Sequence, residues 1–281
     1  MHITPDICRL IDLAIQEDYC MGDVTTEALI PDKAAGTATI VADMDGILAG
    51  LDIALEIFTR MSQETETTKL VNDGNHLIKG QKIAVINGKL SSILTAERTS
   101  LNFLRKLSGV ATETNKYVKA VEHTRAKIVD TRKTTPGFRL LEKYAVRTGG
   151  GHNHRHNLGD GILIKENHTR TLKSEGMTLT DIIQKARNNA PHTIKIEVEV
   201  EDLLQFEEAI EAKAELILLD NMSLADMTKA VNLCNGRALL EASGGINLQS
   251  VSEVAGTGVD LISIGALTHS SPDLDLSLDI D

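Results

Sequence analysis

The second half of this 281-residue chain repeats one short pattern, an apolar run followed by glycine or polar residues and then an amphipathic stretch. Such runs recur at residues 128–129, 161–164, 194–200, 216–219, 238–240 and 261–264. The residues that close four of them follow at spacings of 21, 23 and 22 residues, namely Glu199, Asp220, Ser243 and Gly265. Repeated strand–helix units wind right-handed into a parallel sheet. An eight-fold barrel needs about 250 residues, so residues 106–269 predict a distorted, incomplete α/β barrel of six to seven strands.

Residues 1–105 lack this repeat and predict a separate α+β domain. We expect a leading helix from about 5 to 17 and short strands at 38–42 and 82–86. We expect the C-terminal tail, 270–281, to join this domain. A helix is predicted over about 95–123, with an interruption near Ser108 and Gly109 because glycine weakens a helical pattern. Ser223 and Asn247 are expected to cap later helices.

Composition excludes several classes of protein. Aromatic residues make up only 2% and tryptophan is absent, so the core must be aliphatic, and a pI near 5.3 argues against nucleic-acid binding. No apolar run approaches the roughly 18 residues of a membrane helix, and the N-terminus lacks a basic leader. Three widely spaced cysteines without a CxxC pair favour reduced thiols. We therefore expect a soluble, cytoplasmic protein.

One stretch departs from the acidic character of the chain. The net charge is -11, yet residues 125–173 contain 11 Lys and Arg against 4 Asp and Glu. Here the cations alternate with Gly, Thr and Pro, which shape loops. Four cations beside the ends of the first two predicted barrel strands suit carboxylate or phosphate groups: Arg132, Lys133, Arg155 and Lys165. The alternative, salt bridges to the acidic remainder, leaves the glycines at 149–151 unexplained.

Histidines at 152, 154, 156 and 168 raise the possibility of a zinc or iron site. Arg155 lies within that run, and no carboxylate in the motif offsets a divalent charge. A histidine that hydrogen bonds beside an anion is therefore preferred, and His154, next to Arg155, is the best candidate.

Carboxylates and glycines end the later strands. Glu199 and Asp220 suit Mg²⁺ or ribose hydroxyls, although Glu197 and Glu201 share the side of Glu199 by alternation, and acidic surface residues are the plain alternative. The turns at 243–245 and 264–266 expose backbone amides that could hold phosphate, which is weak evidence alone.

Taken together, the segments GDVTTEAL (22–29), AERTSLNFLRKLSG (96–109), DTRKTTPGFRLLEKYAVRTGGGHNHR (130–155), LIKENH (163–168), EVEVE (197–201), LILLDNM (216–222), ASGGI (242–246) and ISIGALTHS (262–270) resemble the quinolinate phosphoribosyltransferase family. The resemblance runs nearly end to end. It implies an N-terminal α/β sandwich domain plus the incomplete barrel. The site would be completed across the interface of a homodimer, which could associate further. One departure is His156, where relatives often carry an apolar residue.

The resemblance also implies an activity: quinolinate and phosphoribosyl pyrophosphate give nicotinate mononucleotide, pyrophosphate and CO2 in NAD biosynthesis, with Mg²⁺ and no organic cofactor. It assigns quinolinate binding to Arg132, His154, Arg155 and Lys165, with Arg98 reaching the neighbour's site. Thr131 would bind substrate, and the donor would meet Lys133, Glu199, Asp220, Ser243, Gly244, Gly245, Ile264, Gly265 and Ala266, of which Lys133, Glu199 and Asp220 would be catalytic. A metabolite-binding sensor and a histidine-metal hydrolase are the rivals.

Overall fold

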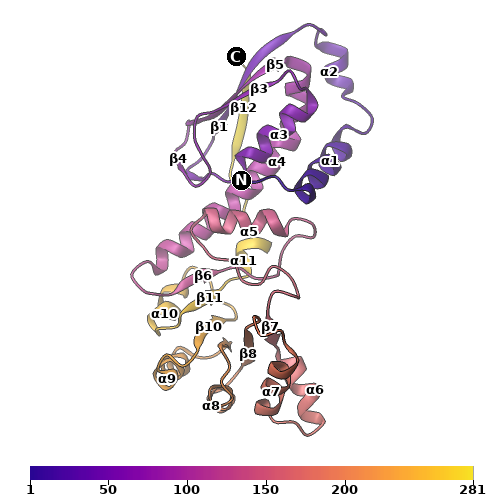
Figure 1. Ribbon diagram of the computed structural model, residues 1–281. Helices are drawn as coiled ribbons and strands as arrows, with labels where there is room; N and C mark the ends of the chain where they lie inside the picture. The colour runs from indigo at the N-terminus through magenta and orange to yellow at the C-terminus, as the bar shows by residue number, and fades with distance from the viewer. Residues whose placement is uncertain (281) are drawn as a thin grey trace. The chain divides into compact units, whose positions relative to one another are not determined.

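The computed structural model describes residues 1–280 and divides into two compact units (Figure 1). Unit 1 contains residues 1–115, 135–150 and those from 270 onward, whereas unit 2 contains 116–134 and 151–269. The domain boundary expected after residue 105 falls inside one continuous helix, α4 (Leu90–Val121). None of the helices within residues 1–280 combines the length and apolar character that crossing a membrane requires.

Unit 1 is built on a four-stranded antiparallel sheet in the order β12-β1-β5-β3. Its strands are β1 (Ala35–Ala42), β3 (Glu66–Lys69), β5 (Lys82–Lys89) and β12 (Leu276–Ile280), and β2 (Gly46–Ile47) pairs separately with β4 (His76–Leu77). The helices are α1 (Pro5–Tyr19), α2 (Val24–Leu29), α3 (Leu51–Met61), α4 up to residue 115, and α5 (Arg139–Thr148). In Figure 1, α3 and α4 run beside the sheet, and Ser100 in α4 donates a hydrogen bond to the Ala54 carbonyl in α3 at 3.0 Å. The leading helix predicted over about 5–17 is confirmed as α1.

Unit 2 contains six parallel strands in the order β6-β11-β10-β9-β8-β7. They are β6 (Lys127–Val129), β7 (Ile162–Ile164), β8 (Ile196–Val200), β9 (Leu216–Asp220), β10 (Leu239–Ser243) and β11 (Leu261–Ser263). The helices are α6 (Glu166–Ser174), α7 (Leu179–Asn189), α8 (Leu203–Glu211), α9 (Leu224–Cys234), α10 (Val251–Gly256) and α11 (Ala266–His269). An isolated parallel bridge joins His152 to Val129 beside β6. Six strands without β6–β7 pairing in the described residues confirm the incomplete barrel.

The interruption predicted near Ser108 and Gly109 is wrong, because α4 continues through both residues. A Cβ on Gly109 would lie 2.1 Å from the Pro272 carbonyl oxygen, so this glycine lets the C-terminal segment approach the helix backbone. Asn247 also caps only a turn: its side chain accepts from the Ser250 amide at 3.2 Å, and Ser250 is the residue that precedes α10. Ser223, by contrast, accepts from the Asp226 amide at 3.1 Å and caps α9 as predicted.

Candidate active site

The predicted ligand-binding residues of the second half lie where the strands of unit 2 end. We call this side of the sheet the carboxyl edge. Because the strands are parallel neighbours, residues that follow each strand meet at this edge. Pairing register also places one set of polar residues on a single face of the sheet: Glu197, Glu199, Asp220, Glu241 and Ser243. Glu201 follows the end of β8 and is exposed, whereas Glu197 is buried and Glu199 is half-buried within β8.

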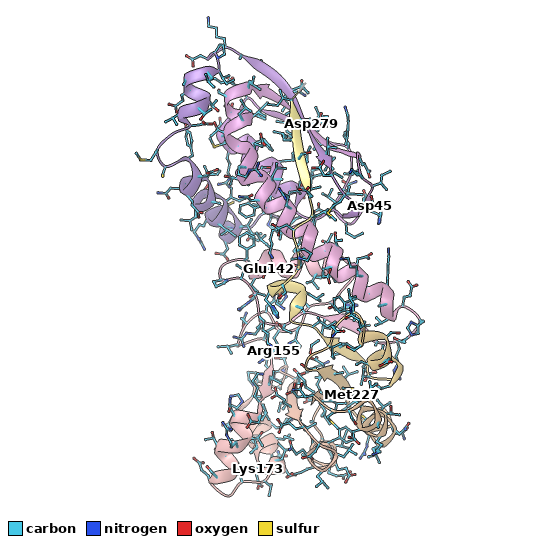
Figure 2. The ribbon with its side chains drawn as sticks, turned by 180° about the vertical axis from the view of Figure 1, so that it is seen from behind. Asp45, Glu142, Arg155, Lys173, Met227 and Asp279 are labelled. Atoms are coloured by element: carbon cyan, nitrogen blue, oxygen red, sulfur yellow. The ribbon has the colours of Figure 1, made fainter. Side chains whose placement is uncertain are left out.

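Arg132, which follows β6, and Arg155, in the loop between β6 and β7, form a pair of neighbouring cations. Arg155, whose side chain is labelled in Figure 2, donates from Nη1 to the Gly161 carbonyl at 3.0 Å. Burial lowers the pKa of its guanidinium, and the charge of Arg132 adds to the shift. Within residues 1–280 neither arginine forms an ion pair with a carboxylate, and both Nε atoms are buried without an acceptor. Two neighbouring guanidinium groups that form no ion pair at contact distance are the arrangement that a dicarboxylate or phosphate would complete.

Lys165 and Glu199 face one another from neighbouring strands. Lys165 Nζ lies 3.2 Å from Glu199 Oε2, and the lysine side chain remains 54% exposed, so its charge is still open to a ligand. The backbone amide of Lys165 donates to His168 Nδ1 at 2.9 Å at the start of α6. His168 therefore caps a helix.

Lys133 is held by the turns around it. Its amide donates to Thr131 Oγ1 at 3.0 Å, and its carbonyl accepts from Thr268 Oγ1 at 2.7 Å. A Cβ on Gly265 would lie 3.0 Å from Lys133 Cδ, so the lysine stem lies against this glycine. The Lys133 side chain therefore lies against the turn at 264–266, which follows β11 at the carboxyl edge.

Asn221 lies beside two of the predicted site residues, Asp220 and Gly244, and sequence reasoning assigned it no role. It adopts a left-handed backbone with φ 53°, and its Nδ2 donates to Asp220 Oδ2 at 2.9 Å. A Cβ on Gly244 would lie 2.2 Å from Asn221 Oδ1, so the turns after β9 and β10 interlock at these two residues. The available signal was an asparagine directly after a strand-ending aspartate, since Asn adopts this conformation more readily than other non-glycine residues.

His154 lies against two buried carboxylates. Its Nε2 is 3.2 Å from Glu197 Oε2 and 3.6 Å from Glu241 Oε2, and the Glu241 side chain is only 1% exposed. Burial alone would lower the pKa of His154, but the hydrogen bond to Glu197 and the two negative charges raise it. Burial and the charge of Glu197 raise the pKa of Glu241 to about 7. Sequence reasoning assigned no role to Glu241, because a lone glutamate within an apolar run has no local signal.

The four histidines do not gather into one metal site. Within residues 1–280, the single group of three or more potential ligands contains one histidine: His154, Glu197 and Glu241. His152 pairs through its backbone with β6, His156 is exposed and His168 caps α6. The preference for a hydrogen-bonding His154 over a histidine cluster agrees with this geometry.

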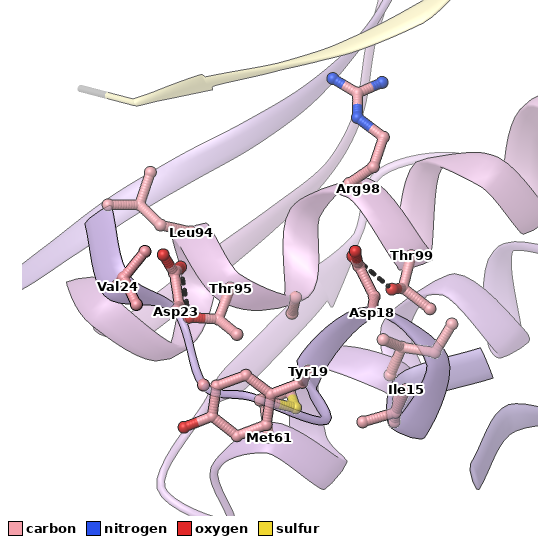
Figure 3. Close-up of a pocket in the computed structure, with 13 residues that line it drawn as sticks. Ile15, Asp18, Tyr19, Asp23, Val24, Met61, Leu94, Thr95, Arg98 and Thr99 are labelled. Carbon is pink, nitrogen blue, oxygen red and sulfur yellow. Dashed lines mark hydrogen bonds between the residues drawn. The ribbon is translucent and has the colours of Figure 1, made fainter. Parts of the chain in front are cut away.

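Arg98 belongs to unit 1, where it lines a pocket of about 300 Å3 (Figure 3). Asp18 accepts from Thr99 Oγ1 at 3.2 Å, and Asp23 accepts from Thr95 Oγ1 at 3.0 Å, so both aspartates tie α4 to the chain around α1 and α2. Figure 3 shows the Arg98 guanidinium turned away from the hydrogen bond between Asp18 and Thr99. Its side chain is 59% exposed with one weak contact to Glu97 at 3.8 Å, which leaves the charge open to a ligand.

Comparison with known proteins decides the family. Residues 23–108 match the model of the quinolinate phosphoribosyl transferase N-terminal domain, and residues 110–279 match that of the C-terminal domain. The chain belongs to the quinolinate phosphoribosyl transferase family. A probable nicotinate-nucleotide pyrophosphorylase [carboxylating] of Bacillus subtilis is 42% identical, covering 97% of this chain and 92% of the relative.

Solved members of the quinolinate phosphoribosyl transferase family share the fold. The nicotinate-nucleotide pyrophosphorylase of Francisella tularensis has a TM-score of 0.94 at 41% identity, covering 99% of this chain and 98% of the other. NadC from Streptococcus pyogenes has a TM-score of 0.95 at 40% identity, with 100% and 99% covered. The predicted family and α/β fold are confirmed.

Proposed function

We propose that this protein transfers the phosphoribosyl group of phosphoribosyl pyrophosphate to quinolinate and removes one carboxyl group. The products are nicotinate mononucleotide, pyrophosphate and CO2, a step in de novo NAD biosynthesis. The observation that carries the proposal is the pair Arg132 and Arg155, whose charges interact and which form no ion pair with a carboxylate in residues 1–280. Quinolinate has two adjacent carboxylates, and two guanidinium groups match them in charge and in planar hydrogen-bonding geometry.

Two further cations, Lys165 and Lys133, would bind the other negative groups of the two substrates. Lys165 would bind a quinolinate carboxylate, since Glu199 engages only one side of its half-exposed ammonium group. Lys133, beside the turn at 264–266, would offset charge on the departing pyrophosphate. The backbone amides of Ser243, Gly244 and Gly245, and of Ile264, Gly265 and Ala266, would bind phosphate oxygens.

The carboxylates would act on the sugar. Departure of pyrophosphate leaves positive charge at ribose C1, and Glu199 and Asp220 on one face of the sheet would stabilise it. The pyridine nitrogen then forms the new bond to C1. The positive charge on the ring nitrogen stabilises the electron pair that stays on C2 when CO2 departs, and a proton from water then takes the place of the carboxyl group at C2, so we infer no organic cofactor. Glu199 and Asp220 are also the hard oxygen donors that would hold Mg²⁺, through water or the donor's pyrophosphate, and the ion would supply positive charge.

A turnover assay tests the activity. Purified protein is given phosphoribosyl pyrophosphate and Mg²⁺ with either quinolinate or nicotinate, and CO2 and nicotinate mononucleotide are followed. Product from quinolinate alone supports the proposal. Product from nicotinate alone, binding without turnover, or tightly held stoichiometric zinc would support a different transferase, a sensor or a metal hydrolase instead.

The arginine pair is tested by substitution. We expect Arg155→Ala to raise KM for quinolinate strongly, with a loss in kcat/KM of about 10²- to 10³-fold. Arg237→Ala is the control, because Arg237 precedes the opposite end of β10 and pairs with Glu211. Unchanged quinolinate saturation in Arg155→Ala would remove this residue from the substrate site.

We further propose a homodimer in which Arg98 completes the neighbour's site. Mixing inactive Arg98→Ala and Arg155→Ala proteins would then restore roughly a quarter of the sites after random exchange, because each mixed dimer has one intact site. Mixing Arg132→Ala with Arg155→Ala should restore none, since those residues come from the same subunit. Proven exchange without recovery in the first mixture would contradict the shared site.

A further inference from the structure

Three residues from separate segments meet beneath the carboxyl edge. Glu197 comes from β8, Glu241 from β10, and His154 from the loop between β6 and β7. Glu197 pairs with Leu216 of β9, and Glu241 pairs with Leu218 of β9. Because Leu216 and Leu218 are two residues apart, they lie on one face of the sheet, and so do the two carboxylates. Their side chains are 6% and 1% exposed, and that of His154 is 13% exposed. The imidazole therefore contacts two charges that solvent does not screen.

The hydrogen bonds of the imidazole decide what this cluster can do. The Arg155 amide donates to His154 Nδ1 at 2.7 Å, so Nδ1 presents a lone pair. The neutral ring then has its proton on Nε2, which faces Glu197 at 3.2 Å. A metal-binding histidine has the opposite arrangement, because it gives one nitrogen to the ion and donates a hydrogen bond from the other. This geometry favours a hydrogen-bonded cluster over a metal centre.

A third carboxylate holds the same loop through its backbone. Asp130 accepts from the His154 amide at 2.8 Å and from Asn153 Nδ2 at 2.6 Å. The ring of His154 contacts β8 and β10 while its amide contacts the residue after β6, so the segment leading into Arg155 is held from both sides. Both ring nitrogens of His154 already have partners inside the protein.

We propose that Glu241, together with Glu197, is a positioning residue that holds His154 and through it Arg155 in the geometry that binds quinolinate. This inference rests on the proposed function, and it differs from the direct quinolinate contact that the family resemblance implies for His154. Both oxygens of Glu241 are buried, and no hydrogen bond within 3.5 Å reaches either of them in residues 1–280, although the Ser263 hydroxyl is near enough to lower the pKa of the carboxyl. A buried carboxylate without hydrogen bonds is costly unless its charge has a use, and the charged groups that face it are His154, Glu197 and Arg155.

The test combines Glu241→Gln, which preserves shape and removes charge, with His154→Ala. We expect Glu241→Gln to raise KM for quinolinate about tenfold to a hundredfold and to leave KM for phosphoribosyl pyrophosphate unchanged. Because Glu241 acts through His154, the double variant should be no worse than His154→Ala alone. Glu211→Gln, an exposed carboxylate whose side chain is 76% exposed, is the control expected to match the parent protein.

Three results would overturn the inference: an unchanged quinolinate KM in Glu241→Gln, additive effects in the double variant, or a stoichiometric metal ion held by His154, Glu197 and Glu241 in the parent protein. Nitrogen-15 spectra of the unliganded protein, recorded at a pH above the raised pKa of His154 so that the ring is neutral, supply a readout without substrate, in which His154 should show the Nε2–H tautomer, altered in Glu241→Gln. A parent protein with this tautomer that turns over no quinolinate would contradict the proposed function alone. A different tautomer in an active parent protein would contradict the positioning role alone.

Discussion

At the scale of single residues, close approaches of backbone decide which side chains the carboxyl edge accepts. Gly244 has φ 100°, and a Cβ there would lie 2.9 Å from the Asn221 backbone nitrogen. Gly245 also has a left-handed φ of 61°, but a Cβ there would have no neighbour within 4 Å. Both glycines therefore have a positive φ, but only Gly244 lacks room for a side chain, so substitutions at the two positions can be compared directly.

We expect Gly244→Ala to lower the free energy of unfolding by about 2 to 4 kcal/mol, because left-handed strain and a steric clash add. Gly245→Ala should cost about 1 kcal/mol from strain alone. Urea unfolding of both variants measures the difference. Equal losses would show that Asn221 moves aside without cost.

Glu241 predicts a pH dependence of stability. Its pKa rises from 4.5 to about 7 on folding, so the native protein binds more protons than the unfolded chain across this range, and stability falls as pH rises through it. The raised pKa of His154 acts in the same direction: its stabilisation is complete below 6.5 and is lost as pH rises through the folded pKa. Glu241→Gln should therefore gain stability relative to the parent protein between pH 5 and 8, by up to about 3 kcal/mol. Urea unfolding at both pH values tests this, and a gain independent of pH would contradict it.

At the scale of elements, α4 shows why a glycine inside a helix need not end it. Gly109 lies in the helix interior, where alanine would ordinarily be favoured by about 1 kcal/mol. The Pro272 carbonyl and Asp273 Cα fill the space where a side chain would begin, at 2.1 and 2.9 Å from an added Cβ. The glycine therefore serves packing rather than helix termination.

Gly109→Ala should accordingly destabilise the protein by about 1 to 3 kcal/mol despite its better helix propensity. Gly256→Ala, at the end of α10, is the control, because an added Cβ there has no neighbour within 4 Å. It should be neutral or stabilising by up to about 1 kcal/mol. Thermal unfolding distinguishes the two, and a stabilised Gly109→Ala variant would mean that the C-terminal segment can move away.

At the scale of the whole molecule, chain order and spatial order differ. The last strand, β12, pairs with β1 across nearly the full length of the sequence, with Leu276 opposite Ala42 and Ile280 opposite Ala38. Leu276 is 2% exposed whereas Ile280 is 43% exposed. Unit 1 thus needs residues from both ends of the chain.

Leu276→Ala should cost about 2 to 4 kcal/mol, whereas Ile280→Ala should cost less than about 1 kcal/mol. Hydrogen exchange of β1 amides, together with urea unfolding, measures whether the loss falls on unit 1. Equal effects of the two substitutions would contradict the burial difference on which this prediction depends.

Local pattern was enough for the strands of unit 2, the cap at Ser223 and the position of Arg132, Arg155 and Lys165 near strand ends, because apolar periodicity and residue order are properties of a short segment. The family followed from motifs of the same kind. Roles of the individual site residues, Mg²⁺ and the dimer stay predictions.

Other features depend on residues far apart in sequence. Periodicity could not order the strands as β6-β11-β10-β9-β8-β7, show that Glu197 is buried and Glu201 exposed, or bring Glu241 to His154. It also misread Gly109, whose neighbour Pro272 is distant along the chain. The sequence by itself determined which residue types end each strand, whereas only tertiary packing decided which of their charges are buried together, since burial and pairing are set by contacts between segments.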